Sequence, residues 1–302
     1  MSETINVLKD NSGIRIDKFL ADYFAEYSRS YISKMIEDNH ILVNNKPVKV
    51  SYKISENDLI LIEDIEPEEV EILPQNIDLD ILYEDNDVIV VNKPKGMVVH
   101  PDNVHNDGTI VNALLYHCKD LSGINGVLRP GIVHRIDMDT TGSVIACKND
   151  YSHEKIANQL ALHSLNRTYI AIVHGVMKED EGRICKPIGR DEKNRKRMAI
   201  NYKNGKEAIT NYRVLKRFEK YTYVECRLET GRTHQIRVHM SSIGYPLLGD
   251  EVYCNKNNPF PNIVKGQCLH AYKLGFIHPR TEEYVETIAP IPSYFQKLLE
   301  IL

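Results

Sequence analysis

The chain has 302 residues, of which 42% are apolar and 26% charged, a composition typical of a globular protein with two domains or one large domain and an appendage. No apolar run approaches the ~20 residues that span a membrane, and residues 1–11 lack the apolar segment of a secretory signal. The six cysteines stand singly and the twelve histidines include no HExxH pair. We therefore expect reduced thiols, a cytoplasmic location and no metal site.

The formal net charge of −4 is an average over two opposed blocks. Residues 63–71 hold six acidic side chains, and residues 183–206 hold nine lysines or arginines against two acidic residues. A basic block favours contact with a polyanion, because each neutralised phosphate releases counterions. A solvated loop would explain the same block, so the net charge does not decide for or against nucleic acid.

Residues 13–62 have the pattern of a small separate module. The expected elements are a helix at 17–24, a second helix capped by Ser28 or Ser30, and strands at 41–43 and 59–62. Four basic residues on or beside the helices could form one face: Arg15, Lys18, Arg29 and Lys34. From these residues alone the module is only a small α/β appendage.

The acidic stretch at 63–79, which contains Pro67 and Pro74, is the natural linker, since prolines and like charges keep a segment extended. Residues 80–302 then form the second domain. Its expected elements are strands at 81–83, 88–92, 167–174, 208–215 and 223–229, and helices at 110–117 and from Asp150 to about 162. Strands outnumber helices, which indicates an α+β fold with a mixed or antiparallel sheet rather than a repeating βαβ fold.

Residues 131–142, "GIVHRIDMDTTG", place several charged side chains in a short loop. A strand is expected to end at Ile132 and Val133 and another to begin at Ser143. Loops between buried strands are suited to present chemistry. Asp137 and Asp139 are chemically equivalent at this stage.

Two other side chains of this loop have simple structural interpretations. Arg135 could pair with Asp139 on the surface. His134 is more often a hydrogen-bonded structural residue than a base.

Residues 231–244, "GRTHQIRVHMSSIG", predict a helix capped by Thr233. The apolar side chains at 236, 240 and 243 recur on the core-facing side. His234 and Arg237 share another face with Ser241, and the N-terminus of such a helix is a favourable place for a phosphate. A helix with a solvated basic side would have the same spacing.

These segments resemble, in order, the motifs of the RluA-type pseudouridine synthases. Residues 131–142 are similar to the HRLDxxTSG motif of that family, with Ile136 for Leu and Thr141 for Ser. The other matching segments are "LYEDNDVIVVNKPKGMVVHP", "GTIVNALLYHC", "PIGRDEKNRKRMAI", "VECRLETGRTHQIRVHMSSIGYPLLGDEVY", "LHAYKLGFIHP" and "APIPSYFQKLL". The module at 13–62 resembles the S4 RNA-binding domain through "SRSYISKMIEDNHILVNNKPVK". The similarity is closest to the type that modifies large-subunit ribosomal RNA.

The resemblance implies a catalytic domain with a mixed or antiparallel sheet flanked by helices, preceded by an S4-like RNA-binding domain. It implies isomerisation of uridine to pseudouridine in structured RNA, in which the N1–C1′ bond breaks and the base rejoins the ribose through C5. The target base must be flipped out of its stack to be reached. The family uses no metal and no organic cofactor.

The resemblance also assigns roles to residues. It makes Asp137 the catalytic carboxylate, which either attacks C1′ or removes the C2′ proton. It makes Arg237 the partner that keeps Asp137 ionised, since a nearby guanidinium lowers the pKa of a carboxyl. Arg135 would fill the gap left by the flipped base.

The resemblance assigns roles to three further residues, and the role of Tyr169 has a simpler structural alternative. Tyr169 would stack on the flipped base, although ordinary sheet packing also explains a tyrosine in a strand. Arg232 and His234 would contact the RNA backbone.

Three other functions stay open at this stage. One is a catalytically silent RNA-binding or ribosome-assembly factor, and another is a pseudouridine synthase that acts on transfer RNA. A third is a hydrolase, such as a nuclease, that uses Asp137 with His134. A monomer is the default expectation for the oligomeric state.

Overall fold

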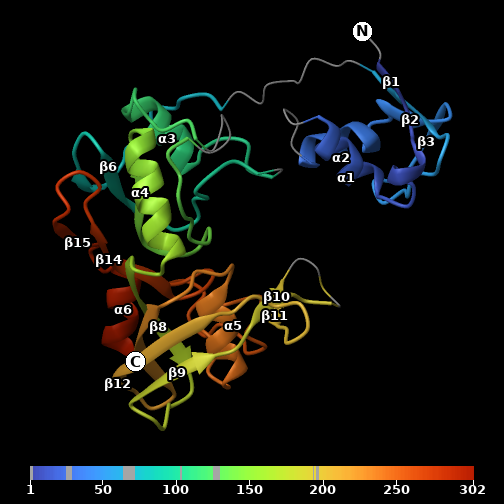
Figure 1. Ribbon diagram of the computed structural model, residues 1–302. Helices are drawn as coiled ribbons and strands as arrows, with labels where there is room; N and C mark the ends of the chain where they lie inside the picture. Colours follow the sequence, from blue (N-terminus) through green and yellow to red (C-terminus); the bar gives the residue numbers. More distant parts are fainter. Residues whose placement is uncertain are drawn as a thin grey trace. The chain divides into compact units, whose positions relative to one another are not determined.

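The computed structural model describes residues 3–24, 29–63, 72–102, 104–124, 130–192, 194 and 197–302. The chain divides into two compact units, Met1–Glu69 and Val70–Leu302 (Figure 1). Several features of the sequence lie outside the described residues: Ser28, residues 64–71 of the acidic stretch, and Lys193, Arg195 and Lys196 of the basic block.

The first unit is a four-stranded antiparallel sheet packed against two helices. Its elements are β1 (Glu3–Asn6), η1 (Lys9–Asn11), α1 (Ile16–Tyr23), α2 (Arg29–Glu37), β2 (Ile41–Val43), β3 (Lys46–Pro47) and β4 (Leu59–Ile62), with strand order β1-β4-β2-β3. Apolar side chains of both helices and of the strands form one core, in which Leu20, Ile32 and Ile60 are fully or almost fully buried. β1 pairs with β4 along its whole length, so the sheet begins ahead of the module predicted at 13–62.

The second half of the expected linker is packed rather than extended. Ile72 is buried in the core of the second unit. The Asn112 side chain donates a hydrogen bond to the Leu73 carbonyl at 2.9 Å, and the Gln75 N–H donates one to the Asn112 carbonyl at 3.0 Å. The prediction of a linker over 63–79 was therefore too long, because residues 72–79 carry apolar and hydrogen-bonding groups that the second unit binds.

The second unit is built on a nine-stranded mixed sheet of order β5-β6-β7-β14-β8-β13-β12-β9, with β15 paired to β14. Its strands are β5 (Ile81–Glu84), β6 (Val88–Lys93), β7 (Thr141–Cys147), β8 (Asn166–His174), β9 (Glu181–Cys185), β12 (Ile209–Arg217), β13 (Tyr221–Leu228), β14 (Leu269–Ile277) and β15 (Tyr284–Ile288). β7 and β14 are parallel, whereas the other neighbours are antiparallel. β10 (Ile188–Arg190) and β11 (Met198–Ile200) form a separate hairpin. The predicted α+β fold with a mixed sheet is confirmed.

Helices cover both faces of this sheet. They are α3 (Ile110–His117), α4 (Asp150–Ala161), α5 (Gln235–Ser242) and α6 (Ser293–Ile301). α3 and α5 pack on the face that carries Ile89 and Val91 of β6, and α4 packs on the face that carries Val88 and Val90. Because both faces are covered, β6 is a continuous apolar run rather than an alternating one.

Three local predictions were wrong by small amounts. The strand expected to end at Ile132 is a single bridge from Ile132 to Ala146. The side chain of Asn149, and not that of Asp150, caps α4 by accepting from the Ser152 N–H. His234, and not Thr233, is the residue ahead of α5. In the described part of the chain, no helix combines the length and apolar character needed to cross a membrane.

Gly142 allows the parallel contact between β7 and β14. Its φ is +108°, and a Cβ there would overlap the backbone of Ala271. We expect Gly142→Ala to lower the free energy of unfolding by about 3 kcal/mol, because positive φ and a backbone clash add. Gly108, with φ +67° and open space around it, is the matched control, and Gly108→Ala should cost about 1 kcal/mol. Equal losses in urea unfolding would contradict this explanation.

Candidate active site

Two lysines, of which Lys93 is buried and Lys95 half-buried, hold the backbone of the loop that carries Asp137. Lys93 is fully buried, and its ammonium donates to the carbonyls of Pro94, Met97 and Met138 at 2.7–2.8 Å. Lys95 donates to the carbonyls of Asp139 and Gln267, both at 2.9 Å. Burial lowers the pKa of Lys93 to about 7. The lysines act on the main chain and leave the carboxylate of Asp137 to other partners.

Arg237 of α5 joins two carboxylates. Its Nε and Nη2 donate to Asp250 at 2.7 and 3.0 Å, and its Nη1 donates to Asp137 at 2.9 Å. The Asp250 side chain is fully buried, whereas that of Asp137 is 24% exposed. Burial would lower the pKa of Arg237, but Asp250 and Asp137 outweigh it and raise that pKa. The guanidinium is thus fixed from behind by Asp250 and offers its remaining edge to Asp137.

The structure distinguishes the two aspartates of the loop. Asp137 receives the hydrogen bond from Arg237. Asp139 instead lies against Gly266, where any Cβ would collide with its carboxylate. Arg237 therefore pairs with Asp137, the aspartate that the family motif designates.

His234 faces Asp137 from the start of α5. It has the left-handed conformation, with φ 56°, and its Nε2 lies 3.8 Å from the Asp137 carboxylate. The Tyr253 hydroxyl accepts from the Met198 N–H at 2.9 Å and lies 2.8 Å from His234 Nδ1. The tautomer with its hydrogen on Nε2 lets the hydroxyl donate to Nδ1 and directs the ring hydrogen toward Asp137. Burial lowers the pKa of His234, against the opposing effect of Asp137.

All six predicted catalytic and substrate-binding residues line one cavity of about 450 Å³: Arg135, Asp137, Tyr169, Arg232, His234 and Arg237. Tyr169 belongs both to the core and to this cavity wall. Its side chain is 8% exposed, and burial raises its pKa to about 12. The packing and site interpretations of Tyr169 are compatible.

Two other arginines of the cavity, Arg135 and Arg232, keep exposed surface. Arg135 is exposed, and its Nη1 lies 3.3 Å from His100 Nε2, so its contact is with His100 rather than Asp139. Arg232 donates from Nε to the Glu207 carbonyl at 2.9 Å. Both guanidinium groups have further donors for an incoming molecule.

His134 is a structural residue. Its Nε2 accepts from the Ile145 N–H at 3.2 Å, and burial lowers its pKa to about 3. A histidine whose lone pair is already occupied is not placed to act as a base, so a hydrolase built on Asp137 and His134 loses its base.

In the first unit, Arg15 and Arg29 share the buried carboxylate of Asp17. Arg15 Nε and Arg29 Nη2 lie 2.9 and 2.7 Å from it. Burial would raise the pKa of Asp17, but the two arginines outweigh it and lower that pKa. Lys18 and Lys34 are exposed on α1 and α2.

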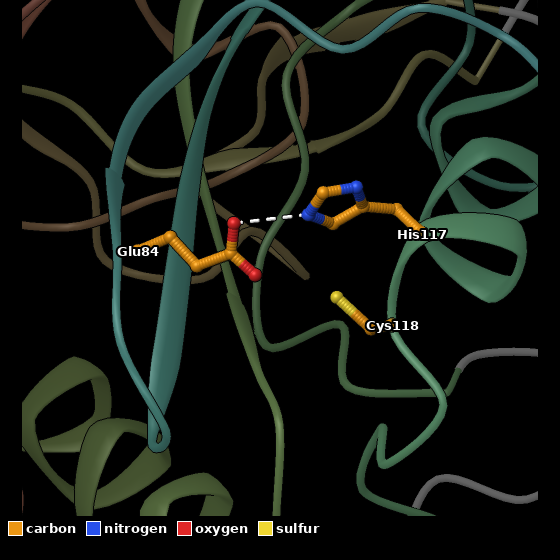
Figure 2. Close-up of side chains that lie close together, drawn as sticks. All are labelled: Glu84, His117 and Cys118. Atoms are coloured by element: carbon orange, nitrogen blue, oxygen red, sulfur yellow. Dashed lines mark hydrogen bonds and ion pairs between the residues drawn. The ribbon is translucent and has the colours of Figure 1, made fainter.

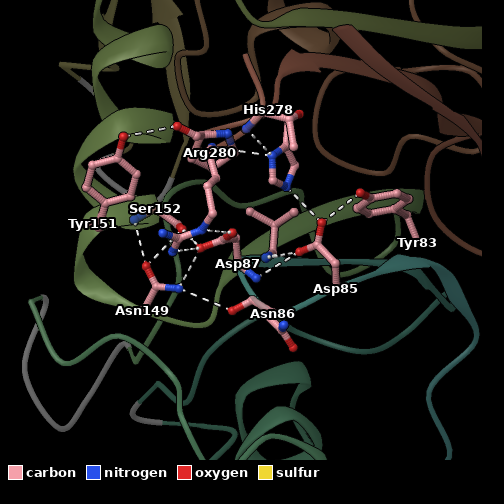
Figure 3. Close-up of polar contacts among 12 residues, drawn as sticks. Tyr83, Asp85, Asn86, Asp87, Asn149, Tyr151, Ser152, His278 and Arg280 are labelled. Carbon is pink, nitrogen blue, oxygen red and sulfur yellow. Dashed lines mark hydrogen bonds and ion pairs between the residues drawn. The ribbon is translucent and has the colours of Figure 1, made fainter. Parts of the chain in front are cut away.

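Two groups outside the cavity bring potential metal ligands within 4.8 Å of one another. Glu84 lies 2.9 Å from His117 Nε2, beside Cys118, and also pairs with Lys148 at 3.1 Å (Figure 2). The second group consists of Asp85, Asp87 and His278. Its carboxylates already accept bonds from Tyr83, Asn149, Ser152, His278 and Arg280 (Figure 3). Both groups serve as polar contacts between elements.

Sequence comparison supports the same interpretation. Residues 87–242 match the sequence profile of the RNA pseudouridylate synthases, and residues 14–60 match that of the S4 domain. The chain belongs to the RNA pseudouridylate synthase family. A Bacillus subtilis protein named as an uncharacterized RNA pseudouridine synthase is 51% identical over 99% of this chain and 97% of its own length.

Two further proteins support the same family assignment. The ribosomal large subunit pseudouridine synthase D of Zymomonas mobilis is 42% identical, with 100% of this chain and 98% of the relative covered. The structure of human RNA pseudouridylate synthase domain containing 1 superimposes with a TM-score of 0.58 at 26% identity, covering 76% of this chain and 87% of that one.

Sequence reasoning did not identify Asp250 or Tyr253. Both lie in the segment "GYPLLGDEVY", which was part of the resemblance. The available signal was one acidic and one aromatic side chain, Asp250 and Tyr253, shortly after the helix that carries Arg237. Only the fold shows that they contact Arg237 and His234.

The ion pairs of Arg237 lead to a stability prediction. Arg237→Met leaves Asp250 buried without its cation, so we expect the free energy of unfolding to fall by about 3–5 kcal/mol. Adding Asp250→Asn removes the orphaned charge and keeps an oxygen for the N–H groups of Val252 and Tyr253. The double variant should therefore recover most of the loss in urea unfolding. A double variant as unstable as the single one would show that Asp250 is not the cause.

Proposed function

We propose that this protein isomerises uridine to pseudouridine in RNA and that large-subunit ribosomal RNA is its substrate. The main support is the contact between Asp137 and Arg237 in a cavity that also contains Tyr169. Attack on C1′ and removal of the C2′ proton both need an ionised carboxylate. An aromatic ring can stack on any base. A protein that only binds RNA has no use for a carboxylate facing phosphates, which disfavours the silent binding factor.

The reaction divides into tasks that the residues can carry out. The target base leaves its stack and enters the cavity, whose volume is within the range of about 300–1,000 Å³ for small-molecule sites. Asp137 acts on the ribose, either by attack on C1′ or by removal of the C2′ proton, and Arg237 favours the ionised form that both roles need. Tyr169 stacks on the base. Arg135 fills the space that the base leaves.

Arg232 and His234 receive different roles. Arg232 keeps free donors at the cavity and is assigned to the RNA backbone. His234 Nε2 lies 3.8 Å from the Asp137 carboxylate, so we assign His234 to the carboxylate instead of the RNA. It would steady Asp137 beside Arg237.

The choice of substrate rests on the relatives and on the first unit. The Zymomonas mobilis relative is named for the large ribosomal subunit, and the S4 profile covers residues 14–60. We assign RNA binding to the face formed by Arg15, Lys18, Arg29 and Lys34. The protein would act as a cytoplasmic monomer, and transfer RNA is the second candidate substrate.

The catalytic assignment is tested with RNA that carries tritium at uridine C5, because rejoining through C5 expels that hydrogen. Wild type should release tritium from a large-subunit ribosomal RNA transcript. Asp137→Asn should release none, since an amide can neither attack C1′ nor take a proton. Asp139→Asn is the matched control and should retain most of the activity. Release by Asp137→Asn and none by Asp139→Asn would mean that the wrong carboxylate was assigned.

RNA binding by the first unit is tested through its two lysines. Lys18→Gln with Lys34→Gln leaves the Asp17 pairing intact and removes up to two phosphate contacts. We expect the slope of log affinity against log salt to decrease in magnitude by about 2. Lys9→Gln, an exposed lysine of the same unit, should change it little. An unchanged slope in the double variant would remove these lysines from the interface.

A further inference from the structure

Arg167 is a buried cation that has no anionic partner among the residues that the structure describes. It lies on β8 and lines the cavity, and its side chain is only 7% exposed. Its Nε is buried and has no hydrogen-bond partner. Burial lowers the pKa of Arg167, Tyr169 opposes that effect and Arg232 adds to it, so among the described residues no carboxylate balances the charge of Arg167.

The fold makes room for this unbalanced charge. Gly231 lies so close that a Cβ at that position would collide with Arg167 Nη1. Charged side chains are almost never buried unless they are paired, and a buried ionisable group without a partner in a cleft is a candidate for function. Arg167 has the properties of a group whose partner arrives with the substrate.

The position of Arg167 points to the base rather than the RNA backbone. Arg167 and Tyr169 are two residues apart on one strand, so their side chains leave the same face of the sheet. Burial raises the pKa of Tyr169, Arg167 opposes that rise, and Asp137 adds to it. Asp137, Tyr169 and Arg167 line the same cavity, so a base stacked on Tyr169 with its ribose at Asp137 can present another edge to Arg167. Arg135 and Arg232 line the same cavity with more exposed side chains and are better placed for phosphates.

We propose that Arg167 binds the carbonyl oxygens of the flipped uracil and stabilises the negative charge on the base after its bond to the ribose breaks. This inference rests on the proposed function and adds a group that acts on the base, whereas Asp137 acts on the sugar. It holds for either role of Asp137.

The electrons explain why a cation is needed there. When the N1–C1′ bond breaks, its electron pair stays on N1, and the uracil anion spreads the charge over N1, O2 and O4. The sugar is completed either by a new bond from Asp137 to C1′ or by a C1′–C2′ double bond, with the C2′ proton on Asp137. C5 then bonds to C1′ as the carboxylate leaves, or as the proton returns to C2′. Finally C5 loses its hydrogen as a proton and N1 gains one.

The symmetry of uracil fits a single fixed cation. A half-turn of the detached base about the line through N3 and C6 exchanges N1 with C5 and O2 with O4. A guanidinium beside one carbonyl oxygen before the turn is therefore beside the other afterwards. Its several donors keep that contact in both orientations, and its charge is already in place when the anion forms.

The test compares Arg167→Gln and Arg167→Lys with wild type in single-turnover tritium release. RNA affinity is measured in parallel at several salt concentrations. We expect Arg167→Gln to lower the rate constant at saturating RNA by about 10²–10³-fold, with RNA affinity and its salt slope unchanged. Arg167→Lys should recover part of the rate, because it keeps the charge. Arg213→Gln, an exposed arginine on β12, is the control for loss of a positive charge.

A stability measurement separates this role from a structural one. Because Arg167 is buried without a partner, Arg167→Met should leave the unfolding midpoint unchanged or raise it, while abolishing most of the activity. A lower midpoint for Arg167→Met would indicate a structural role and overturn the proposal.

The remaining outcomes are distinct. A loss of affinity with a salt slope smaller by about 1 and a preserved rate would assign Arg167 to a phosphate. An unchanged rate in Arg167→Gln would remove it from the reaction. If wild type releases no tritium from large-subunit, transfer or precursor ribosomal RNA, the proposed function itself fails.

Discussion

The guanidinium of Arg237, shared between Asp250 and Asp137, is the interaction on which the site depends. A buried cation needs a partner, and Asp250 satisfies that need with two hydrogen bonds and no exposure of its own. The orientation of Arg237 is thereby fixed before any substrate arrives. Arg237 therefore keeps its direction without help from Asp137, so the Asp137 carboxylate can remain partly exposed and still be held in place.

In the loop that carries Asp137, the backbone and the Asp137 side chain are held by separate contacts. Lys93 and Lys95 bind carbonyls of the loop, while Arg237 and His234 face the carboxylate of Asp137. Each set of contacts comes from a different part of the sheet or its covering helices. Such support from several directions keeps a reacting group within the small displacements that catalysis tolerates.

The sequence predicted what local spacing determines. The helix at 110–117 and the strands at 41–43 and 59–62 follow from apolar periodicity, and their bounds match. Caps were missed by one residue because neighbouring polar residues, such as Asn149 and Asp150, can both accept the first hydrogen bonds. Contacts between distant residues were not accessible: Asp137 and Arg237 are 100 residues apart, and only the resemblance joined them. Arg167 was overlooked because an arginine in a strand gives no sign that it lacks a partner.

The charges of the cavity also explain how a chain of net charge −4 can work on RNA. Arg237 pairs with both Asp137 and Asp250, which leaves these three residues with one negative charge. Arg135, Arg167 and Arg232 add three positive charges around the same space. Fields at this range are set by the nearest groups, not by the average over the chain. In the proposed reaction, the exposed arginines would attract the RNA backbone equally before and during the chemical step, so they would favour binding. A cation that meets its full counter-charge only when the base becomes an anion interacts more strongly with the transition state than with the substrate, and it therefore increases the rate rather than the affinity.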